Sequence, residues 1–227
     1  HKDWVKSMRL SKNGKFIVGG DMTKHLTIWH LTFKDNVPSA NKIVHYELSQ
    51  RKSCKDDGCI CVEIDENGPK FYAGTHQGEV LILNWKEEKE IISIEDSGHV
   101  DDACFLFDEK RLAVVGEGKK VVIFDLENER QDRTWLTKNK KVYSICASKF
   151  NDVQYFLTGG KNGIIGIWRA DLKKKDKTLV SNEGIFEGHR HPVNVLKVDD
   201  EGERVYSSAL EEKHIRVWNM HFRICEK

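Results

Sequence analysis

Apolar and polar residues alternate in short runs along this chain. Ile215 and Val217 flank Arg216, whereas the run from Val80 to Leu83 is apolar at every position. Alternation with a period of two is typical of a strand with one buried face, and a short continuous apolar run fits a strand buried on both faces. No apolar period of about 3.6 residues persists through ten residues. The pattern therefore predicts an all-β protein.

Polar turns that contain Gly separate these runs. The clearest are Lys12–Gly14, Asp65–Gly68, Lys161–Gly163 and Glu201–Gly202. Asn and Gly tolerate the positive φ angles that tight hairpins require. Only three prolines interrupt the chain. We therefore expect antiparallel strands joined by short hairpins.

One sequence pattern recurs five times. It consists of an alternating run, a polar turn, a pair of small residues, a second turn, and a run that ends in a bulky residue. The copy that starts at His1 matches the copy that starts at His189 without a gap over twenty residues. The closing residues lie 54, 41, 44 and 50 positions apart, at Trp29, Leu83, Phe124, Trp168 and Trp218. These spacings bracket the period of about 40–45 residues of four-stranded propeller blades. The predicted blades span residues 1–48, 54–95, 98–136, 138–187 and 189–227.

The chain resembles the WD-repeat β-propeller family. The resemblance rests on Gly98-His99 and Gly188-His189 before first strands, on the small pairs, and on third strands that end in Trp or Phe. In that family an Asp six residues before the Trp holds the Gly-His histidine in a buried hydrogen-bond relay. The corresponding residues here are Thr23, Gln77, Gly118, Asn162 and Glu212. We therefore expect no full relay, with Glu212, His189 and Trp218 as the remaining candidates.

Five blades raise the question of ring closure. Propellers have about four to eight blades, members of the resembled family more often have seven, and uncovered sheet edges promote aggregation. Three arrangements stay open: part of a larger ring, an arc completed by a partner or second copy, and a closed five-blade ring. The start at His1 rather than Met favours the first. We expect five consecutive blades of a ring of about seven.

Composition narrows the class of protein. The 227 residues are 39% hydrophobic and 32% charged, which is typical of a globular protein. The 37 basic and 36 acidic residues give no electrostatic argument for nucleic acid or a membrane as an obligatory partner. No apolar run reaches the length of a membrane span, and no signal-like segment opens the chain. We expect an intracellular protein and leave nucleus and cytoplasm open.

The six cysteines do not form a recognisable framework. Cys104 and Cys146 fall in predicted first strands and Cys225 in the predicted outer strand Phe222–Glu226. The cluster Cys54, Cys59 and Cys61 lacks the paired spacing of zinc ligands. We therefore expect free thiols in a reducing compartment, and neither a metal nor a cofactor.

Two segments break the repeat. Lys42–Leu48 alternates and is predicted to be the outer strand of the first blade, flanked by polar loops. Leu172–Lys177 is a basic tract, which is either a solvated loop or a docking site for RNA, a phosphopeptide or an acidic partner. The neutral charge of the whole chain favours the loop.

The sequence gives little evidence for an enzyme, because no nucleophile motif, phosphate-binding loop or close Cys-His-Asp arrangement occurs. In the resembled family, loops that enter first strands and turns between second and third strands share one face, the top face. We expect a protein or peptide partner there. The candidate contacts are Trp4, Asp56, Asp57, Asp101, Asp102, Lys140, Lys141, Arg190 and His191. Trp4 either joins this interface or packs onto its own blade.

The leading hypothesis is a non-catalytic scaffold that mediates protein–protein interaction within a multiprotein complex. The alternative is a nucleic-acid-associated propeller of an RNA-processing or ribosome-assembly complex. Its contacts would be Lys138, Lys140, Lys141 and Lys173–Lys175. Such binding would weaken steeply as salt increases, because it depends on phosphate contacts.

Overall fold

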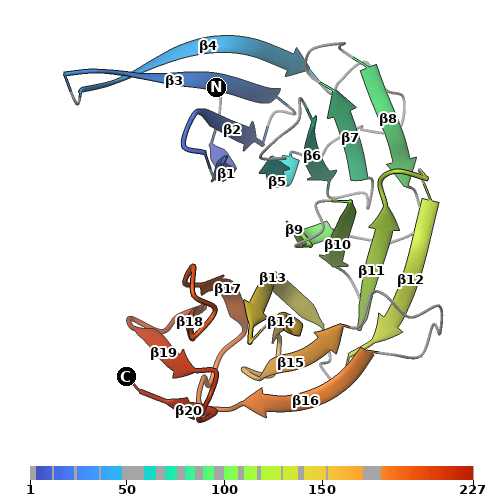
Figure 1. Cartoon of the computed structure of the whole chain (residues 1–227), viewed down its shortest axis with the longest axis vertical. Coiled ribbons are helices and arrows are strands. Elements are labelled where there is room, and N and C mark those ends of the chain that lie inside the picture. The colour runs from blue at the N-terminus through green and yellow to red at the C-terminus, as the bar shows by residue number, and fades with distance from the viewer. Residues whose placement is uncertain are drawn as a thin grey trace. The chain divides into compact units, whose positions relative to one another are not determined.

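The structure is a computed structural model that contains strands and no helix among the residues it describes (Figure 1). Contacts divide the chain into two compact units, His1–Asp102 and Ala103–Lys227. The all-β prediction is confirmed. The described residues are 4–11, 13–22, 25–35, 37–47, 59–64, 70–75, 80–84, 89–94, 100–106, 110–116, 119–128, 130–137, 141–151, 153–170 and 180–226.

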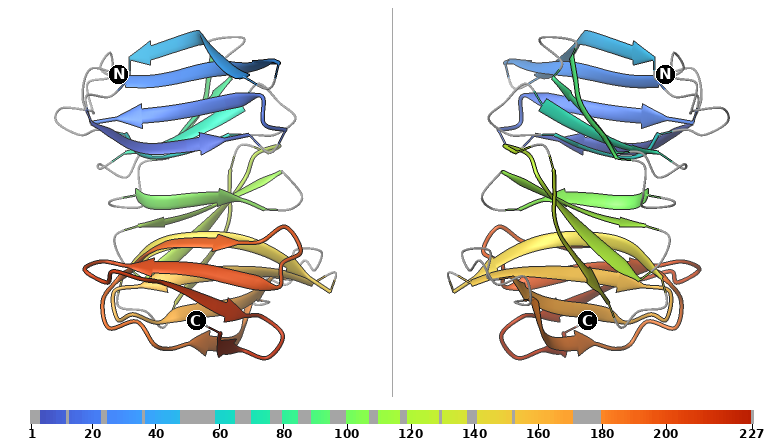
Figure 2. Two further views of the ribbon diagram at one scale, coloured as in Figure 1. Left: turned by 90° about the vertical axis from the view of Figure 1, so that its left-hand side faces the viewer. Right: turned by 90° about the vertical axis from the view of Figure 1, so that its right-hand side faces the viewer.

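The described strands form five four-stranded sheets, in each of which the strands follow one another in chain order. Neighbouring strands run antiparallel, as the ribbons in Figure 2 show. We number the sheets from 1 to 5 along the chain. The predicted four-stranded antiparallel sheets are thus confirmed.

Sheets 1 and 2 belong to the first unit. Val18, Leu26 and Ile28 of sheet 1 pack against Val62, Ile64 and Phe71 of sheet 2, all with almost no exposed surface. The Ser7 hydroxyl accepts a hydrogen bond from the Val62 backbone N–H at 3.1 Å and so ties the two first strands together. Sheet 1 consists of β1 (Val5–Leu10), β2 (Phe16–Asp21), β3 (His25–Lys34) and β4 (Val37–Glu47). Sheet 2 consists of β5 (Cys59–Ile64), β6 (Lys70–Thr75), β7 (Val80–Asn84) and β8 (Lys89–Ile94).

The outer hairpin of sheet 1 is longer than predicted. Strand β4 begins at Val37, and β3 continues to Lys34, with a tight turn in which Asp35 has a φ of 52°. Phe33 lies opposite Pro38 in the register. The polar loop expected before Lys42 was therefore wrong. The strand contains Pro38, which is tolerated because β4 is an edge strand, where a residue without an N–H donor disrupts no ladder.

The remaining strands form sheets 3, 4 and 5, and β9 crosses the boundary between the two units. Strand β20 is shorter than the predicted Phe222–Glu226, because Arg223 has a φ of 57° and closes a turn onto the Asn219 carbonyl. Sheet 3 consists of β9 (Val100–Phe105), β10 (Arg111–Gly116), β11 (Lys120–Asp125) and β12 (Arg130–Leu136). Sheet 4 consists of β13 (Val142–Phe150), β14 (Val153–Gly160), β15 (Ile165–Ala170) and β16 (Val180–Phe186). Sheet 5 consists of β17 (Val193–Val198), β18 (Arg204–Ala209), β19 (Ile215–Asn219) and β20 (Ile224–Cys225).

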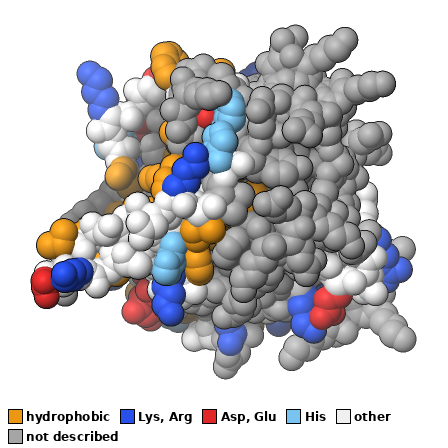
Figure 3. Space-filling model, turned by 90° about the horizontal axis from the view of Figure 1, so that it is seen from above, with side chains coloured by type: hydrophobic (Ala, Val, Ile, Leu, Met, Phe, Trp, Pro, Cys, Tyr) orange, Lys and Arg blue, Asp and Glu red, His pale blue; other side chains and the backbone are white. Residues whose placement is uncertain are grey.

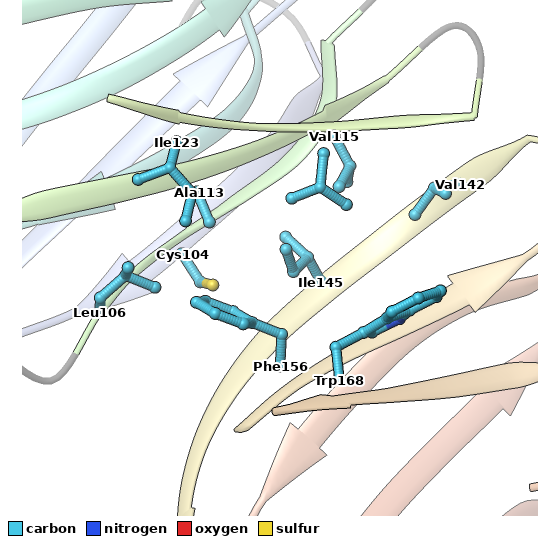
Figure 4. Packing of buried hydrophobic residues seen from close by; sticks show 10 residues of the cluster. Cys104, Leu106, Ala113, Val115, Ile123, Val142, Ile145, Phe156 and Trp168 are labelled. Atoms are coloured by element: carbon cyan, nitrogen blue, oxygen red, sulfur yellow. The ribbon is translucent and has the colours of Figure 1, made fainter. Parts of the chain in front are cut away.

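Two hydrophobic cores join the sheets of the second unit face to face. Between sheets 3 and 4, Phe156 and Trp168 pack with Cys104 and Ala113 (Figure 4). Between sheets 4 and 5, the Phe186 ring stacks on Trp218 with the ring centroids 5.1 Å apart. Burial of each large apolar side chain stabilises the fold by about 1.5–3 kcal/mol. Trp168 and Trp218, two of the repeated closing residues, thus act as core residues between neighbouring sheets.

Polar contacts fix the approach of sheet 5 to sheet 4. The Ser144 hydroxyl donates to the Val193 carbonyl oxygen at 3.1 Å. Gly163 has a φ of 76°, and a Cβ there would collide with the His189 carbonyl oxygen. This close approach requires glycine at position 163, because any side chain would push the two sheets apart at that end.

The cysteines of the described region agree in position with the sequence analysis. Cys104 and Cys146 are buried in β9 and β13, and Cys225 is exposed in β20. Cys54 and the side chains of Cys59 and Cys61 lie outside what the structure describes. Within the same limits, no helix has the length and apolar character needed to cross a membrane.

Candidate functional site

A continuous chain of hydrogen bonds crosses sheet 5. The Trp218 indole N–H donates to Ser207 Oγ at 2.7 Å, and Ser207 Oγ lies 2.6 Å from His189 Nε2. On the other side of the ring, His189 Nδ1 lies 2.7 Å from Glu212 Oε2. With a proton on Nδ1, His189 donates to Glu212 and accepts the Ser207 hydroxyl proton. Each group in the chain is then satisfied.

The expectation that no blade carries a full relay is therefore wrong for sheet 5. Glu212 takes the place of the Asp, although its side chain is one methylene longer. The sequence identified Glu212, His189 and Trp218 as the best candidates but could not show that they meet. Ser207 was noticed only as one of a pair of small residues, whereas its hydroxyl joins the histidine to the indole.

Glu212 also holds the loop that enters sheet 5. Its Oε1 accepts the backbone N–H groups of Arg190 at 2.6 Å and His191 at 3.3 Å. A second link joins the same segments, because the Leu210 N–H donates to the Pro192 carbonyl oxygen at 2.9 Å. The entry loop and the turn between β18 and β19 are thus held in one fixed arrangement.

The surroundings of Glu212 favour its ionised form. Burial raises the pKa of the carboxyl, but the hydrogen bonds from His189, Arg190 and His191 overcome this effect. The pKa is lowered from 4.5 to about 2. Glu212 therefore carries a negative charge at neutral pH and remains an acceptor for all of these donors.

Sheet 4 contains only the inner half of such a relay. The Trp168 indole N–H donates to Thr158 Oγ1 at 2.9 Å, as Trp218 does to Ser207. Asn162 stands at the position of Glu212, and the residue equivalent to His189 is Lys138, which lies outside the described residues. The indole–hydroxyl bond therefore forms here without a Gly-His histidine.

Sheet 1 contains a different buried polar pair. Asp21 is fully buried at the end of β2, and its Oδ1 accepts the His25 backbone N–H at 2.9 Å. The His25 ring stacks on His45, with the centroids 4.9 Å apart. The His45 Nδ1 lies 3.1 Å from Thr27 Oγ1. These side chains stabilise the turn between β2 and β3, in a sheet whose Gly19 supplies no relay hydroxyl.

The exposed residues around the sheet 5 relay form a rim of mixed charge. We call this surface the relay rim, and it consists of Arg190, His191, Leu210, Glu211, Lys213 and His214. His191 Nδ1 lies 3.6 Å from Glu211 Oε2, so part of the charge is paired within the rim. The rim thus presents both signs of charge and one apolar side chain on a backbone that Glu212 holds in place.

The predicted contact residues differ in how exposed their side chains are and in the contacts that they make. Trp4 is 77% exposed and is accessible to a partner. Asp102 is half-buried and pairs with Arg9 at 3.3 Å, and Asp101 is also half-buried. In the second unit, the Lys141 ammonium lies 4.8 Å from the centroid of the Tyr143 ring. Arg190 is exposed and His191 half-buried, both in the relay rim.

Several predicted contacts cannot be placed. Asp56, Asp57 and Lys140 lie outside the residues that the structure describes, as do Lys138 and Lys173–Lys175 of the nucleic-acid alternative. On the face seen in Figure 3, the described hydrophobic, basic, acidic and histidine side chains are interspersed. Those visible side chains form no large field of a single charge.

Each sheet is a four-stranded antiparallel meander, and sheets 4 and 5 pack face to face through Trp218. Hydrogen bonds connect this tryptophan to a Gly-His histidine. These features are those of a repeat protein of the β-propeller class. Comparison with protein families agrees with this class. The model described as WD domain, G-beta repeat, matches residues 1–30 and 181–219. The two matched segments support a relationship to the WD-repeat family. A search of curated proteins gave no match.

Proposed function

We propose that the protein is a non-catalytic scaffold that binds a protein segment at its top face and thereby takes part in a multiprotein complex. WD repeats generally mediate protein–protein interaction and are typically not catalytic. The relay rim is the part of this face for which the described residues supply a structural argument. Trp4 is a second candidate contact, in the first unit.

The observation that carries this proposal is the way in which Glu212 clamps the entry loop of sheet 5. Its two backbone hydrogen bonds hold the segment that bears Arg190 and His191 before any partner arrives. A surface that is already ordered loses little conformational entropy on binding. Exposed Arg190 and Lys213 beside Glu211 favour a peptide with acidic residues and at least one basic residue.

Peptides selected from a random display library against the purified chain provide a test. We expect Arg190→Glu combined with Lys213→Glu to weaken binding of the selected peptides by about tenfold or more, since two attractive charges become repulsive. The control is Lys149→Glu with Glu201→Lys, at exposed positions around the hairpin turns of β13–β14 and β17–β18. Peptides that bind the rim variant as well as the original chain would overturn the rim as the site, as would equal losses in the control.

We also propose that residues 1–227 are five consecutive blades of one WD-repeat domain with further blades, in a ring of about seven. Ile165 and Ile215 both start the third strand of their sheets. Ile165 is completely buried against sheet 5, whereas Ile215 is 63% exposed. The face of sheet 5 that carries Ile215 therefore has the positions that receive another sheet elsewhere in the second unit.

The face of sheet 1 that carries Met8 is the counterpart of the sheet 5 face that packs on sheet 4. Met8 is 59% exposed, whereas Leu196 at the equivalent position of sheet 5 is buried against sheet 4. A further sheet of the same repeat would fit on Met8 as sheet 4 fits on Leu196. Large exposed apolar side chains that follow one strand face are typical of surfaces that are covered in the working protein.

Oxidation of methionine tests this arrangement. In the longer protein we expect Met8 to be oxidised at least several-fold more slowly than in the chain 1–227, because a further sheet would cover it. Met22 is 40% exposed and lies in the turn after β2, so its oxidation rate is the internal control. Equal oxidation of Met8 in both proteins would contradict a larger ring.

A further inference from the structure

Three side chains that can ligate a metal converge at the outer end of the sheet 5 relay. They are His189, Glu212 and His214, the one such group of three found among the described residues, and their ligand atoms all lie within 4.8 Å of one another. His189 Nδ1 lies 2.7 Å from Glu212 Oε2, and His214 Nε2 lies 3.0 Å from the same oxygen. Two imidazole nitrogens therefore point at one carboxylate oxygen.

We propose that His189 Nδ1, His214 Nε2 and Glu212 Oε2 bind a divalent transition metal of the zinc type, with water as the fourth ligand. Two imidazoles and a carboxylate form a donor set that suits Zn²⁺ and related ions. This inference is independent of the proposed scaffold function, because it concerns a small ion and not a protein partner.

The divided roles of the Glu212 oxygens make the site feasible. Oε1 accepts the backbone N–H groups of Arg190 and His191, so Oε2 alone would ligate the metal. The loop contacts therefore persist when the ion binds. They also orient the carboxylate, as hydrogen bonds to a metal-ligating carboxylate do in established sites.

Metal binding requires a change of tautomer in His189, whose imidazole stays neutral. In the relay the proton on Nδ1 points to Glu212. When Nδ1 holds the metal, the ring proton resides on Nε2 and is donated in a hydrogen bond to Ser207 Oγ, 2.6 Å away. The Ser207 hydroxyl hydrogen then rotates away from Nε2. A metal-ligating histidine that donates its other ring N–H to a protein acceptor is the usual arrangement.

Binding requires a rearrangement of the three ligand atoms. Ligand atoms at about 2.0–2.1 Å from a tetrahedral metal lie roughly 3.3 Å from one another, so the Nδ1–Oε2 pair must open by about half an ångström. The ligand nitrogens of His189 and His214, which lie within 4.8 Å of each other, must also approach to roughly 3.3 Å. His214 supplies the freedom, because its side chain is 54% exposed. His189 has a fully buried side chain and therefore supplies a fixed ligand.

Arg216 opposes the ion. Its Nε lies 3.8 Å from Glu212 Oε2, so its positive charge repels a cation at the site. The site should therefore bind more weakly than a closed four-ligand zinc site. Removal of that charge should strengthen binding, which a purely structural histidine cluster would not show.

The experiment is titration of the metal-free chain with Zn²⁺ by calorimetry, repeated with Co²⁺, whose visible absorption reports tetrahedral ligation. We expect one ion per chain. His214→Ala should weaken binding by about tenfold or more, since one of three protein ligands is lost. Arg216→Gln should strengthen it several-fold. His191→Ala is the matched control, because this neighbouring histidine faces Glu211 rather than Glu212.

The outcomes separate the possibilities. Binding that depends on His214 but not on His191, and that Arg216→Gln strengthens, supports the site. The absence of stoichiometric binding would overturn it, as would equal affinity of the His214→Ala variant or equal losses in both histidine variants. His214 is exposed, so its replacement leaves the fold of sheet 5 intact, and circular dichroism of the variant verifies this.

Discussion

Trp218 donates its indole N–H to Ser207 Oγ at 2.7 Å, in the interior of sheet 5. Trp168 makes the equivalent bond to Thr158 in sheet 4. In sheet 5, but not among the described residues of sheet 4, the hydroxyl also meets a histidine that reaches a surface carboxylate. Trp168 and Trp218 occupy equivalent core positions. Hydrogen bonds connect Trp218 of sheet 5 to the loops that form the candidate binding surface.

The Ser207 hydroxyl should be the most sensitive member of the relay. We expect Ser207→Ala to lower the free energy of unfolding by about 1–3 kcal/mol, because the buried Trp218 N–H and His189 Nε2 both lose their partner. Urea denaturation monitored by tryptophan fluorescence measures this. Ser208→Ala is the control, since the side chain of Ser208 is on the other face of β18. Equal losses in the two variants would show that the relay contributes nothing specific.

Glu212 should make stability depend on pH in the acid range. Its pKa is about 2 in the folded chain and near 4.5 when exposed, so the unfolded chain binds more protons between these values. The stabilisation is therefore complete above pH 4.5 and is lost as pH falls through about 2. Glu212→Gln should remove this part of the pH dependence in denaturation curves measured from pH 6 to pH 3. An unchanged pH profile in that variant would contradict the assignment.

Gly163 should tolerate substitution far less well than Gly14. Both have φ near 70°, but a Cβ at Gly163 would collide with the His189 carbonyl oxygen, whereas nothing lies within 4 Å of one at Gly14. Gly14→Ala should cost about 1–2 kcal/mol from the backbone alone. Gly163→Ala should cost at least about 1 kcal/mol more, because the loop of sheet 5 must move. Similar melting temperatures for the two variants would refute a close contact at that end of sheets 4 and 5.

Ile165 and Ile215 should respond differently to truncation in the chain 1–227. Ile165→Ala should cost about 2–5 kcal/mol, because it opens a cavity between sheets 4 and 5. Ile215→Ala should change stability by no more than about 0.5 kcal/mol, as for other exposed positions. Chemical denaturation of both variants tests this, and a large loss at Ile215 would show that its face is already covered.

Local chemistry explains which features could be predicted. The strands follow from period-two patterns, the turns from Gly and Asn, and the repeated bulky residues from the need of each sheet to bury one face on the next. Trp168, Trp218 and Phe124 all lie in the predicted core. The outer strand Lys42–Leu48 was predicted, but β4 begins earlier, at Val37. Whether a strand tolerates Pro38 depends on whether it lies at the edge of its sheet, which no local pattern shows.

By itself the sequence determined the type of each element and the repeat, because these depend on neighbours within one strand or hairpin. The tertiary structure decided that Glu212 can replace the expected Asp. That outcome required His189, Ser207 and Glu212, which are up to 23 residues apart, to meet within hydrogen-bond distance. It also decided that Ile165 is buried and Ile215 exposed. Two identical residues in equivalent strands differ only in whether another sheet lies against them, and no local pattern contains that information.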